Sequence, residues 1–399
     1  MSLVTDSILL TINGGSSSIK FAAFTPGGSS KRLLDGTIDR IGLDHSTLTW
    51  RAVGGASQSN PIDASDHKQA AERLIDWMEN HIGGHRVRGI GHRVVHGGLH
   101  LTAHQLVTPE LIAELRRTQP LDLAHLPREI ELIETFAAHF PSVPQVACVD
   151  TAFHRDLPKV AQLLPIPRHY FEAGVRRFGF HGLSYAYLMQ ELLRLGGEAE
   201  ANGRVILAHL GSGASMAAVY QGKPIDTTMA FTPTAGLVMG TRPGDLDPGL
   251  LIYMMRVEKK TPEEMDQFIS HECGLVGLSE TTSDMRDLTA RRQSDARADD
   301  AVAVFCYQAR KWIGAYAAAL GGLDTLVFAG GIGEHGVEAR EQICHGLEFL
   351  SLHIDPEKNR ASAPVISSDT SRVNVRVIKT DEESMIAKAV DEILSREKP

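Results

Sequence analysis

Three glycine-rich turns, each following an apolar run, are the clearest chemical feature of the sequence; they occupy residues 13–18, 211–215 and 330–334. Glycine lets the backbone approach a ligand closely, and consecutive N–H groups and serine hydroxyls can bind phosphate oxygens. The third turn also leads into a predicted helix, whose N-terminus favours negative charge. None of the turns matches the P-loop or the dinucleotide-binding pattern. Three such turns in one chain nevertheless predict a phosphate-handling site.

Two arginines, Arg93 and Arg242, lie in stretches that contain several glycines. A guanidinium held on a glycine-flanked strand end can grip a carboxylate or a phosphoryl group through two hydrogen bonds. A single arginine more often forms an ion pair on the protein surface than binds a ligand. Pro243 and Gly244 make a rigid, tight loop beside Arg242, and this favours the binding role for that residue.

Asp150 and His181 are further candidates for chemistry. Asp150 ends a predicted buried strand at 145–149, and open α/β sheets place their ligands at the carboxyl ends of strands. There it could hold a metal ion or orient a nucleophile, or it could cap the next helix, and its position leaves both open. His181 lies between aromatic residues and glycines. Such a histidine is usually a core or capping residue, but the glycines would let it face a cleft and donate to a developing charge.

Four histidines recur at every fourth position: His92, His96, His100 and His104. On a helix this spacing would predict a metal-binding face. The valines at 94–95 and the glycines at 97–98 argue against a helix here, so the spacing carries little weight. A histidine-metal hydrolase stays as a minor alternative, which would contain stoichiometric zinc.

The composition is that of an ordinary globular enzyme, with 399 residues, 43% hydrophobic and 22% charged, including 37 Gly and 18 Pro. These values exclude a disordered, fibrous or collagen-like chain. The 40 Lys and Arg against 49 Asp and Glu give a net charge of −9. An acidic balance argues against nucleic-acid binding and against charge-driven membrane binding.

Cysteine usage and the absence of long apolar runs predict the compartment. The cysteines are far apart, in or beside apolar stretches, which favours buried thiols over disulfides or zinc ligands; they are Cys148, Cys273, Cys306 and Cys344. No apolar run approaches the roughly 18 residues of a membrane span, and the N-terminus lacks the basic region of a signal peptide. We therefore expect a cytoplasmic protein.

The elements that must position these residues alternate in an α/β manner. Two apolar runs joined by a glycine turn fill 8–24, and the same pattern returns 196 residues later at 205–220. An offset near half the chain length suggests two duplicated lobes, although a chance likeness of two hairpins stays open. Strands alternating with helices predict a mixed or parallel sheet with covered faces. Further strands are predicted at 87–95, 143–149 and 323–329, and helices at 67–78, 109–117, 127–140, 248–257, 262–271, 299–320, 337–347 and 381–394.

Together these motifs resemble the acetate and propionate kinase family, of the sugar-kinase, Hsp70 and actin superfamily. The likeness extends from residue 8 to about residue 389, in the family's order, at 13–20, 91–98, 150–154, 178–182, 209–215, 239–245, 283–286, 330–334 and 382–383. It implies an α/β fold of two duplicated lobes of the actin-like ATPase (ribonuclease H-like) type with an interlobe catalytic cleft. It also implies an N-terminal lobe at 1–150, closed by part of the C-terminal helix at about 381–399, and a C-terminal nucleotide-binding lobe at 151–399.

The resemblance implies a homodimer that transfers the γ-phosphoryl group of ATP to acetate, or to another short carboxylate, reversibly and with Mg²⁺ or Mn²⁺. The transfer would be direct and in line. An acetate-like carboxylate is already a nucleophile at pH 7 and needs no general base, so the difficulty is to bring two anions together. Arginines, a histidine and a divalent cation suit that task.

By the same resemblance, roles pass to the matching residues of this chain. Catalysis would fall to Arg93, Asp150, His181 and Arg242. The carboxylate pocket would be formed by Arg93, Val95, Ala124, Phe180 and Pro233, and the metal ion would be held by Asn13 and Glu382. ATP would contact Lys20, His209, Gly211, Ser212, Gly213, Ala214, Ser215, Asp284, Met285, Arg286, Gly331, Ile332, Gly333, Glu334 and His335.

Four positions depart from the family's pattern. Ser212 replaces an asparagine and should only tune binding, whereas His335, also in place of an asparagine, puts that nucleotide contact in doubt. Asp381 adds a charge beside the proposed metal ligand. Ala124 replaces a leucine of the acyl pocket, which predicts an enlarged pocket that accepts propionate as well as acetate. A strict acetate preference would contradict that hypothesis.

An ATP-dependent conformational switch of the Hsp70 or actin kind is the alternative from another functional class. It would share the repeated phosphate-binding hairpins. It would need neither two active-site arginines nor a hydrophobic carboxylate pocket. Trapping with hydroxylamine separates the two, because only a kinase yields acyl hydroxamate from ATP and acetate.

Overall fold

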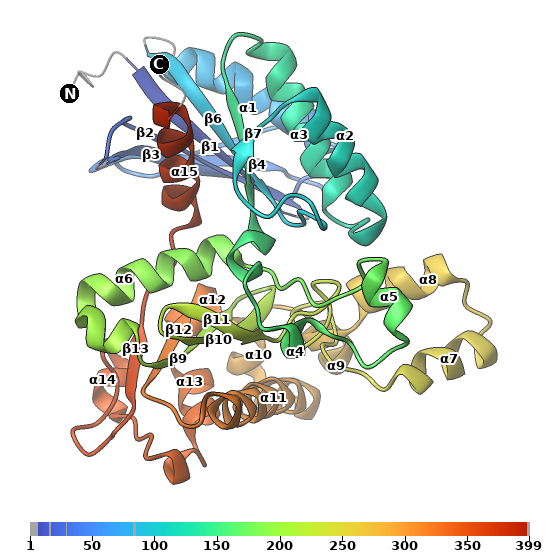
Figure 1. Ribbon diagram of the computed structural model, residues 1–399, viewed down its shortest axis with the longest axis vertical. Helices are drawn as coiled ribbons and strands as arrows, with labels where there is room; N and C mark the ends of the chain where they lie inside the picture. The colour runs from blue at the N-terminus through green and yellow to red at the C-terminus, as the bar shows by residue number, and fades with distance from the viewer. Residues whose placement is uncertain (1–6, 16, 29, 83–84, 397–399) are drawn as a thin grey trace. The chain divides into compact units, whose positions relative to one another are not determined.

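The computed structural model describes residues 7–15, 17–28, 30–82 and 85–396. The chain divides into two compact units (Figure 1). The N-terminal unit is Met1–Ala152 with Asp381–Pro399, and the C-terminal unit is Phe153–Thr380. Ser16, in the first glycine-rich turn, lies outside the described residues.

The N-terminal unit is built on a sheet that has eight strands over the described residues, in the order β5-β4-β3-β2-β1-β6-β8-β7. The strands are β1 (Ser7–Gly14), β2 (Ser18–Phe24), β3 (Arg32–Asp39), β4 (Thr47–Ala52), β5 (Gln58–Pro61), β6 (Arg86–Val94), β7 (Gln105–Leu106) and β8 (Gln145–Val149). Strands β1 to β5 pair antiparallel, whereas β1, β6 and β8 pair parallel. The carboxyl ends of the parallel strands therefore meet at one edge of the sheet, where α/β sheets place their ligands.

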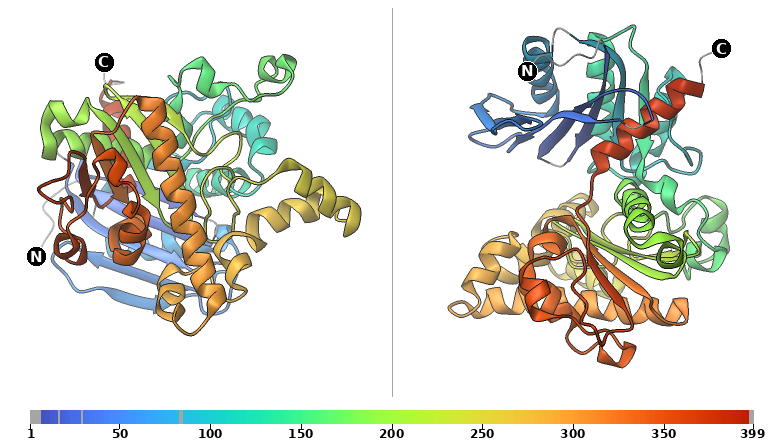
Figure 2. Two further views of the ribbon diagram at one scale, coloured as in Figure 1. Left: turned by 90° about the horizontal axis from the view of Figure 1, so that it is seen from below. Right: turned by 90° about the vertical axis from the view of Figure 1, so that its left-hand side faces the viewer.

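Helices cover both faces of this sheet. Helices α1 (His67–Ile82) and α3 (Leu126–His139) lie on one face, with α2 (Pro109–Thr118) beside α3, and α15 (Glu382–Arg396) crosses the other (Figures 1 and 2). Glycines permit the close approach on both sides. A Cβ on Gly14 would lie 2.7 Å from Leu132 of α3, and one on Gly91 would lie 2.3 Å from Ile386 of α15.

The C-terminal unit has a sheet of five strands in its described residues, in the order β11-β10-β9-β12-β13. They are β9 (Arg204–Leu210), β10 (Ala214–Tyr220), β11 (Lys223–Thr227), β12 (Thr325–Ala329) and β13 (Asn374–Val377). The long helices α6 (Gly182–Ala201) and α11 (Ala296–Leu320) cover opposite faces of it (Figures 1 and 2). The other helices of this unit are α4 (Lys159–Gln162), α5 (Arg168–Glu172), α7 (Pro248–Val257), α8 (Pro262–Gln267), α9 (Gly274–Ser279), α10 (Met285–Arg291), α12 (Gly330–His335), α13 (Val337–Cys344) and α14 (Pro356–Arg360).

The two sheets repeat one topology. The order β3-β2-β1-β6-β8 in the N-terminal unit corresponds to β11-β10-β9-β12-β13, with the same antiparallel and parallel pairings. Strands β1 and β9 end at Gly14 and Leu210, and β2 and β10 begin at Ser18 and Ala214, so both hairpins keep the 196-residue offset. This agreement favours duplication over chance, and the predicted mixed α/β class with two related lobes is confirmed.

Most predicted helices and strands are confirmed to within a few residues, and α7 has the predicted bounds. Two predictions are wrong in detail. Residues 330–335, predicted as a turn before a helix at 337, themselves form α12, and the helix predicted for 262–271 stops at Gln267 and continues as a π-turn. Strands β3 to β5 and helix α6 are missing from the prediction. Strand β5 is fully exposed and has no apolar alternation, and α6 contains a kink at Gly197 (φ 73°).

The predicted thiols and the predicted lack of a membrane span can both be compared with the structure. Cys148, Cys306 and Cys344 are buried, Cys273 is partly buried, and all four are free of disulfides. Burial raises the pKa of Cys306 to about 12. In the described part of the chain, no helix has both the length and the apolar character needed to cross a membrane.

Replacing Gly91 by alanine tests the contact between the N-terminal sheet and α15. The added Cβ would lie 2.3 Å from Ile386 and 2.7 Å from Val390, so the helix or strand β6 must shift. We expect Gly91→Ala to lower the free energy of unfolding by roughly 1–3 kcal/mol, as overpacking does, in urea denaturation. Gly28→Ala is the matched control, because a Cβ there meets no atom within 4 Å. Equal stability of the two variants would contradict this packing.

The buried His92 predicts a loss of stability in mild acid. Its Nε2 bonds to the Gln145 side-chain oxygen at 2.6 Å, and burial lowers the pKa of His92 to about 4. In the unfolded chain the pKa is about 6.5, so the unfolded state binds more protons and stability falls as the pH drops from about 6.5 towards 4.

In His92→Gln, the loss of unfolding free energy between pH 7 and pH 5 should be about 2 kcal/mol smaller than in the unsubstituted protein. His100→Gln, which changes an exposed histidine, should leave that loss unchanged. Denaturant titrations at the two pH values measure it, and an equal loss in His92→Gln would show that His92 does not stay neutral in the fold.

Candidate active site

Arg93 and Asp150 form an ion pair at the carboxyl ends of neighbouring parallel strands. Arg93 belongs to β6, and Asp150 directly follows β8. The guanidinium donates to Asp150 Oδ2 through Nη2 at 2.7 Å and through Nε at 3.1 Å. The Asp150 side chain is fully buried and that of Arg93 is 15% exposed. Burial alone would lower the pKa of Arg93, but the carboxylates of Asp150 and Glu382 outweigh it and raise that pKa above its usual value.

Asn13 connects this ion pair to α15. It lies near the end of β1, and its Nδ2 donates to Glu382 Oε2 at 2.9 Å and to Glu383 Oε1 at 3.3 Å. Its Oδ1 accepts from Arg93 Nη1 at 3.3 Å. Burial, together with the charge of Glu382, raises the pKa of Glu383. The structure thus brings the predicted residues Asn13, Arg93, Asp150 and Glu382 into one network, although Glu382 comes from the far end of the sequence.

This network offers oxygen ligands for a divalent cation. The described residues contain no group of three or more His, Cys, Asp or Glu that could hold a metal ion by itself. Mg²⁺ needs no such cage, because it is commonly bound by one or two carboxylates, with waters and substrate phosphates completing an octahedron. Asn13 and Glu382 supply an amide oxygen and a carboxylate, which are oxygen donors of that kind, although here the amide oxygen accepts from Arg93 and the amide nitrogen donates to Glu382. The donor set therefore fits Mg²⁺ that binds together with a nucleotide.

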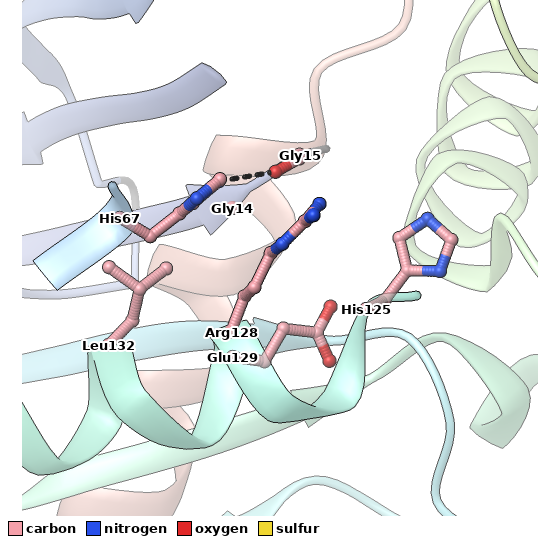
Figure 3. A pocket seen from close by; sticks show the side chains of 7 residues that line it. All are labelled: Gly14, Gly15, His67, His125, Arg128, Glu129 and Leu132. Carbon is pink, nitrogen blue, oxygen red and sulfur yellow. Dashed lines mark hydrogen bonds between the residues drawn. The ribbon is translucent and has the colours of Figure 1, made fainter. Parts of the chain in front are cut away.

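A small recess lies beside the first glycine-rich turn (Figure 3) and is lined by Gly14, Gly15, His67, His125, Arg128, Glu129 and Leu132. His67 Nε2 donates to the Gly15 carbonyl oxygen at 2.8 Å and so holds the turn. Burial lowers the pKa of His67. On the loop before α3, the carboxylate of Asp122 accepts from His125 Nδ1 at 2.9 Å, which fixes the His125 ring.

Glu129 is a site residue that the sequence analysis did not identify. Its two carboxylate oxygens accept from the Val95 N–H at 3.0 and 3.2 Å, and the side chain is buried. Burial raises the pKa of Glu129 well above its usual range, although the charge of Arg93 opposes this. Glu129 therefore fixes the main chain of Val95, a predicted wall of the acyl pocket. Nothing in the sequence marks it, because a glutamate in the first turn of a helix is ordinary.

In the C-terminal unit, His181, His209 and Arg242 surround the turn between β9 and β10. His181 has a left-handed backbone (φ 58°), and its ring stacks on that of His209 with 4.3 Å between centroids. A Cβ on Gly213 would lie 2.9 Å from Arg242 Nη2 and 3.3 Å from His181 Nε2. The guanidinium and the imidazole therefore both lie against this turn, and only glycine leaves them room.

The loop that carries Arg242 is as tight as its sequence predicts. Gly244 has φ 75°, and a Cβ there would lie 2.4 Å from the Gly236 carbonyl oxygen. Arg242 Nη1 donates to the Pro233 carbonyl oxygen at 2.6 Å, so the arginine holds another predicted wall of the acyl pocket. Pro233 is buried.

The third glycine-rich turn is braced by its own glutamate. Glu334 Oε1 accepts from the N–H groups of Gly330 and Thr380, both at 3.1 Å. The fully buried Arg340 donates through Nη1 to the carbonyl oxygens of Gly333 at 2.8 Å and Glu334 at 2.9 Å. The turn is thus held from both ends, and Arg340 is a second supporting residue that the sequence pattern did not reveal.

The predicted nucleoside-binding segment begins α10. Asp284 is the N-cap, accepting from the Arg286 N–H at 2.8 Å, and its Oδ2 pairs with Arg286 Nη2 at 2.6 Å. The Arg286 side chain is 87% exposed, whereas Met285 is buried. A ligand could therefore meet the Arg286 guanidinium but not the Met285 side chain.

The predicted site residues fall into two groups, one in each unit. The N-terminal group comprises Asn13, Lys20, Arg93, Val95, Ala124, Asp150 and Glu382, and the remaining predicted residues belong to the C-terminal unit. Lys20, predicted as a phosphate ligand together with His209, is an exposed residue of β2 that pairs in register with Asn13. The structure thus places it with the carboxylate network.

The four regularly spaced histidines lie on β6 and on the segment that follows it, not on a helix, as predicted. His96 Nδ1 accepts from the Gly98 N–H at 2.9 Å, and His104 Nδ1 accepts from the Val149 N–H at 3.0 Å. With His92 bonded to Gln145, these contacts give three of the rings structural roles. No observation favours the zinc hydrolase.

Comparison with known proteins identifies the family. The profile of the Acetokinase family matches residues 8–388. An acetate kinase of Rhodopseudomonas palustris is 42% identical over 389 residues, 96% of this chain and 97% of the relative. A propionate kinase of Citrobacter rodentium is 41% identical over 399 residues, 98% of each chain. The crystal structure of Porphyromonas gingivalis acetate kinase is 34% identical with a TM-score of 0.86, covering 97% of this chain and 100% of that one. The chain therefore belongs to the Acetokinase family.

Proposed function

We propose that this protein is an acetate kinase, which transfers the γ-phosphoryl group of ATP to acetate, reversibly, to give acetyl phosphate and ADP. The proposal rests mainly on two arginines, Arg93 and Arg242, in a chain that belongs to the Acetokinase family. Arg93 is fixed among carboxylates at the edge of the N-terminal sheet. Arg242 lies against the phosphate-binding type of turn beside His181.

The proposed reaction requires mainly that the charges of the two reacting anions are neutralised and that the anions are correctly positioned. A carboxylate oxygen of acetate attacks the γ-phosphorus, and the bond from phosphorus to the β-phosphate oxygen breaks, so no proton need be removed. The barrier lies in the approach of two anions and in the charge that spreads over the equatorial phosphoryl oxygens. Preorganised cations lower such a barrier, and guanidinium groups match carboxylate and phosphoryl oxygens in pairs.

We assign the catalytic roles to Arg93, Asp150, His181 and Arg242. Arg93 and Arg242 hold the carboxylate and the phosphoryl group in transfer, and His181 adds a hydrogen bond to the phosphoryl oxygens. Asp150 lies beside the transferred group and keeps Arg93 oriented through the 2.7 Å ion pair. Because Arg93 is already immobilised by three side chains, its reorganisation during the reaction is small.

Asn13 and Glu382 are the residues that would hold Mg²⁺, or Mn²⁺ in its place. Bound there, the ion would neutralise part of the negative charge of the ATP phosphates. We assign phosphate contacts to Lys20, His209 and the turn 211–215, and nucleoside contacts to 284–286 and 331–335. Because Glu334 already braces its turn, the N–H groups of that turn, rather than the carboxylate, are the expected ligands.

The acyl pocket is assigned to Val95, Ala124, Phe180 and Pro233. The main chain of two of these walls is held by other side chains: Glu129 accepts from the Val95 N–H, and Arg242 donates to the Pro233 carbonyl oxygen. Acetate is the substrate we propose.

Hydroxylamine trapping tests the reaction. With ATP, Mg²⁺ and acetate, the protein should produce acyl hydroxamate, and kcat/KM should be higher for acetate than for propionate or butyrate. Arg93→Ala and Arg242→Ala should each lower kcat by about 100-fold or more, because each removes a cation that acts in the transition state.

Arg51→Ala is the control for these variants, because Arg51 is 56% exposed and pairs only peripherally with Asp35. Arg93→Lys, which keeps the charge but loses the bidentate geometry, covers the case in which Arg93→Ala fails to fold. ATP hydrolysis without hydroxamate would favour the conformational switch. Undiminished turnover in a folded Arg93→Ala or Arg242→Ala variant would exclude the mechanism.

We further propose a cytoplasmic homodimer with α7 in its interface. The free thiols and the use of ATP fit the cytoplasm. Helix α7 is mostly apolar, yet none of its residues is buried, and contiguous apolar surface of this kind usually marks an interface. Its exposed residues are Leu250 (42%), Ile252 (49%), Tyr253 (60%) and Val257 (59%).

Tyr253→Asp should convert the dimer to a monomer, because it places a charge in the apolar surface of α7. Light scattering coupled to size exclusion should show half the mass of the unsubstituted protein. Leu43→Asp, at a residue 59% exposed in the N-terminal unit, should leave the mass at that of the dimer. A monomeric unsubstituted protein, or a Tyr253→Asp variant that stays dimeric, would contradict this interface.

A further inference from the structure

We propose that buried hydroxyl groups fix the tautomers of the stacked rings His181 and His209, so that each presents an Nε2–H donor to phosphoryl oxygens. Ser215 with Tyr185 serves His181, and Ser184 with Thr380 serves His209. These hydroxyl residues are then positioning residues of the phosphoryl-transfer site. The inference rests on the proposed kinase function, which it deepens.

The two histidines have the same kind of contact at Nδ1. His181 Nδ1 lies 2.8 Å from Ser215 Oγ, and that oxygen is also hydrogen-bonded to the Tyr185 hydroxyl. His209 Nδ1 lies 2.8 Å from Ser184 Oγ, which is 2.8 Å from Thr380 Oγ1. Each ring thus ends a chain of two hydroxyls.

Burial makes these chains specific. Ser184, Ser215 and Tyr185 are all 0% exposed, whereas Thr380 is only partly buried. A buried hydroxyl cannot exchange its partner for bulk water without cost, so its single proton has a defined acceptor. The ring nitrogen at the end of the chain must fit that arrangement.

The direction of donation follows from the acidity of the groups. A phenol is a stronger donor than an alkyl hydroxyl, so the Tyr185 O–H donates to Ser215 Oγ. The remaining proton of Ser215 then donates to His181 Nδ1. A neutral imidazole has one N–H, and because Nδ1 accepts, the proton resides on Nε2. Ser184 and Thr380 are both alkyl hydroxyls, so acidity does not order the donors beside His209, and the placement of its proton on Nε2 rests on the surroundings of that atom.

The surroundings of both Nε2 atoms agree with this assignment. His181 Nε2 lies 3.3 Å and Arg242 Nη2 lies 2.9 Å from the point where a Cβ on Gly213 would be. His209 Nε2 and the Gly331 backbone nitrogen each lie 3.9 Å from the corresponding point on Gly211, and the Gly213 carbonyl oxygen, which accepts from the Gly211 N–H, lies 3.3 Å from it. Each imidazole nitrogen is therefore grouped with a cationic or N–H donor around a glycine turn. A lone pair on Nε2 would repel the anion that such donors attract.

The Ser215 hydroxyl consequently has a different role from the phosphate ligand predicted by the resemblance. Its proton and its oxygen are both used between Tyr185 and His181. Any contact of Ser215 with ATP in the proposed site would fall to its main chain.

Ser215→Ala and Ser184→Ala test the inference, with histidine-selective ¹⁵N NMR as the first readout. In the unsubstituted protein both rings should show the Nε2–H tautomer, with His181→Gln and His209→Gln providing the assignments. Each serine variant should give a mixture of tautomers at the histidine that it contacts and leave the other histidine unchanged. An Nδ1–H tautomer in the unsubstituted protein, or an unchanged tautomer in a serine variant, would overturn the inference.

Kinetics provide the second readout. Ser215→Ala should lower kcat about 10- to 100-fold and alter its pH profile, with less than a threefold change in KM for ATP and acetate, because the lost effect is the orientation of a donor. Ser215→Thr, which keeps the hydroxyl, should recover most of kcat. Ser46→Ala, at a buried serine bonded only to main-chain carbonyls, should change neither readout. Failure of the proposed function would show as no hydroxamate from the unsubstituted protein, whereas failure of this inference shows in the NMR spectra.

Discussion

The buried ion pair of Arg93 and Asp150 is the constraint on which the N-terminal site depends. A guanidinium and a carboxylate removed from water are costly unless each is fully paired. Here Asp150 is completely buried, and Arg93 is also bonded to Asn13 and lies 4.0 Å from Glu382. These partners come from β1, β6, the end of β8 and the start of α15. The parallel strands and the returning C-terminal helix are therefore both required to keep one arginine charged, oriented and only slightly exposed.

The repeated topology gives each unit its functional turn. With the 196-residue offset, Asn13 of the first hairpin corresponds to His209 of the second. In the N-terminal unit the side chain at this position, Asn13, donates to the carboxylate of Glu382. In the C-terminal unit the corresponding ring, His209, stacks on His181 beside a glycine turn. Equivalent backbones thus carry opposite chemistry: oxygen ligands in one unit and N–H or cationic donors in the other. The proposed metal–nucleotide substrate would use both kinds of group, which offers a physical reason for the divergence of two duplicated units.

Sequence reasoning finds elements and candidate residues that local patterns mark, and it misses residues that act through tertiary contacts. The hairpins, the bounds of α7 and the candidates Asn13, Arg93, Asp150 and Arg242 follow from turn chemistry, periodicity and motif resemblance. Glu129 is not predictable in this way, because its partner Val95 lies 34 residues away on another element. The bond between Ser215 and His181 likewise spans 34 residues. Glu334 shows a contact that its motif does not indicate, because its carboxylate accepts from the N–H of Gly330 in its own turn.

The acyl pocket shows why a single substitution in its lining does not determine its size. In the proposed pocket, Ala124 would remove volume from one wall, and this by itself would favour a longer acyl chain by the free energy of burying one methylene, roughly 1–3 kcal/mol. That gain requires the other walls to stay where they are or to move apart. Val95 is held through its backbone by a buried carboxylate, and the Pro233 carbonyl by the Arg242 guanidinium. The main chain of both proposed walls is therefore held by hydrogen bonds to side chains from other parts of the chain. In the proposed pocket, substrate preference would then depend on these supporting side chains as well as on the lining ones.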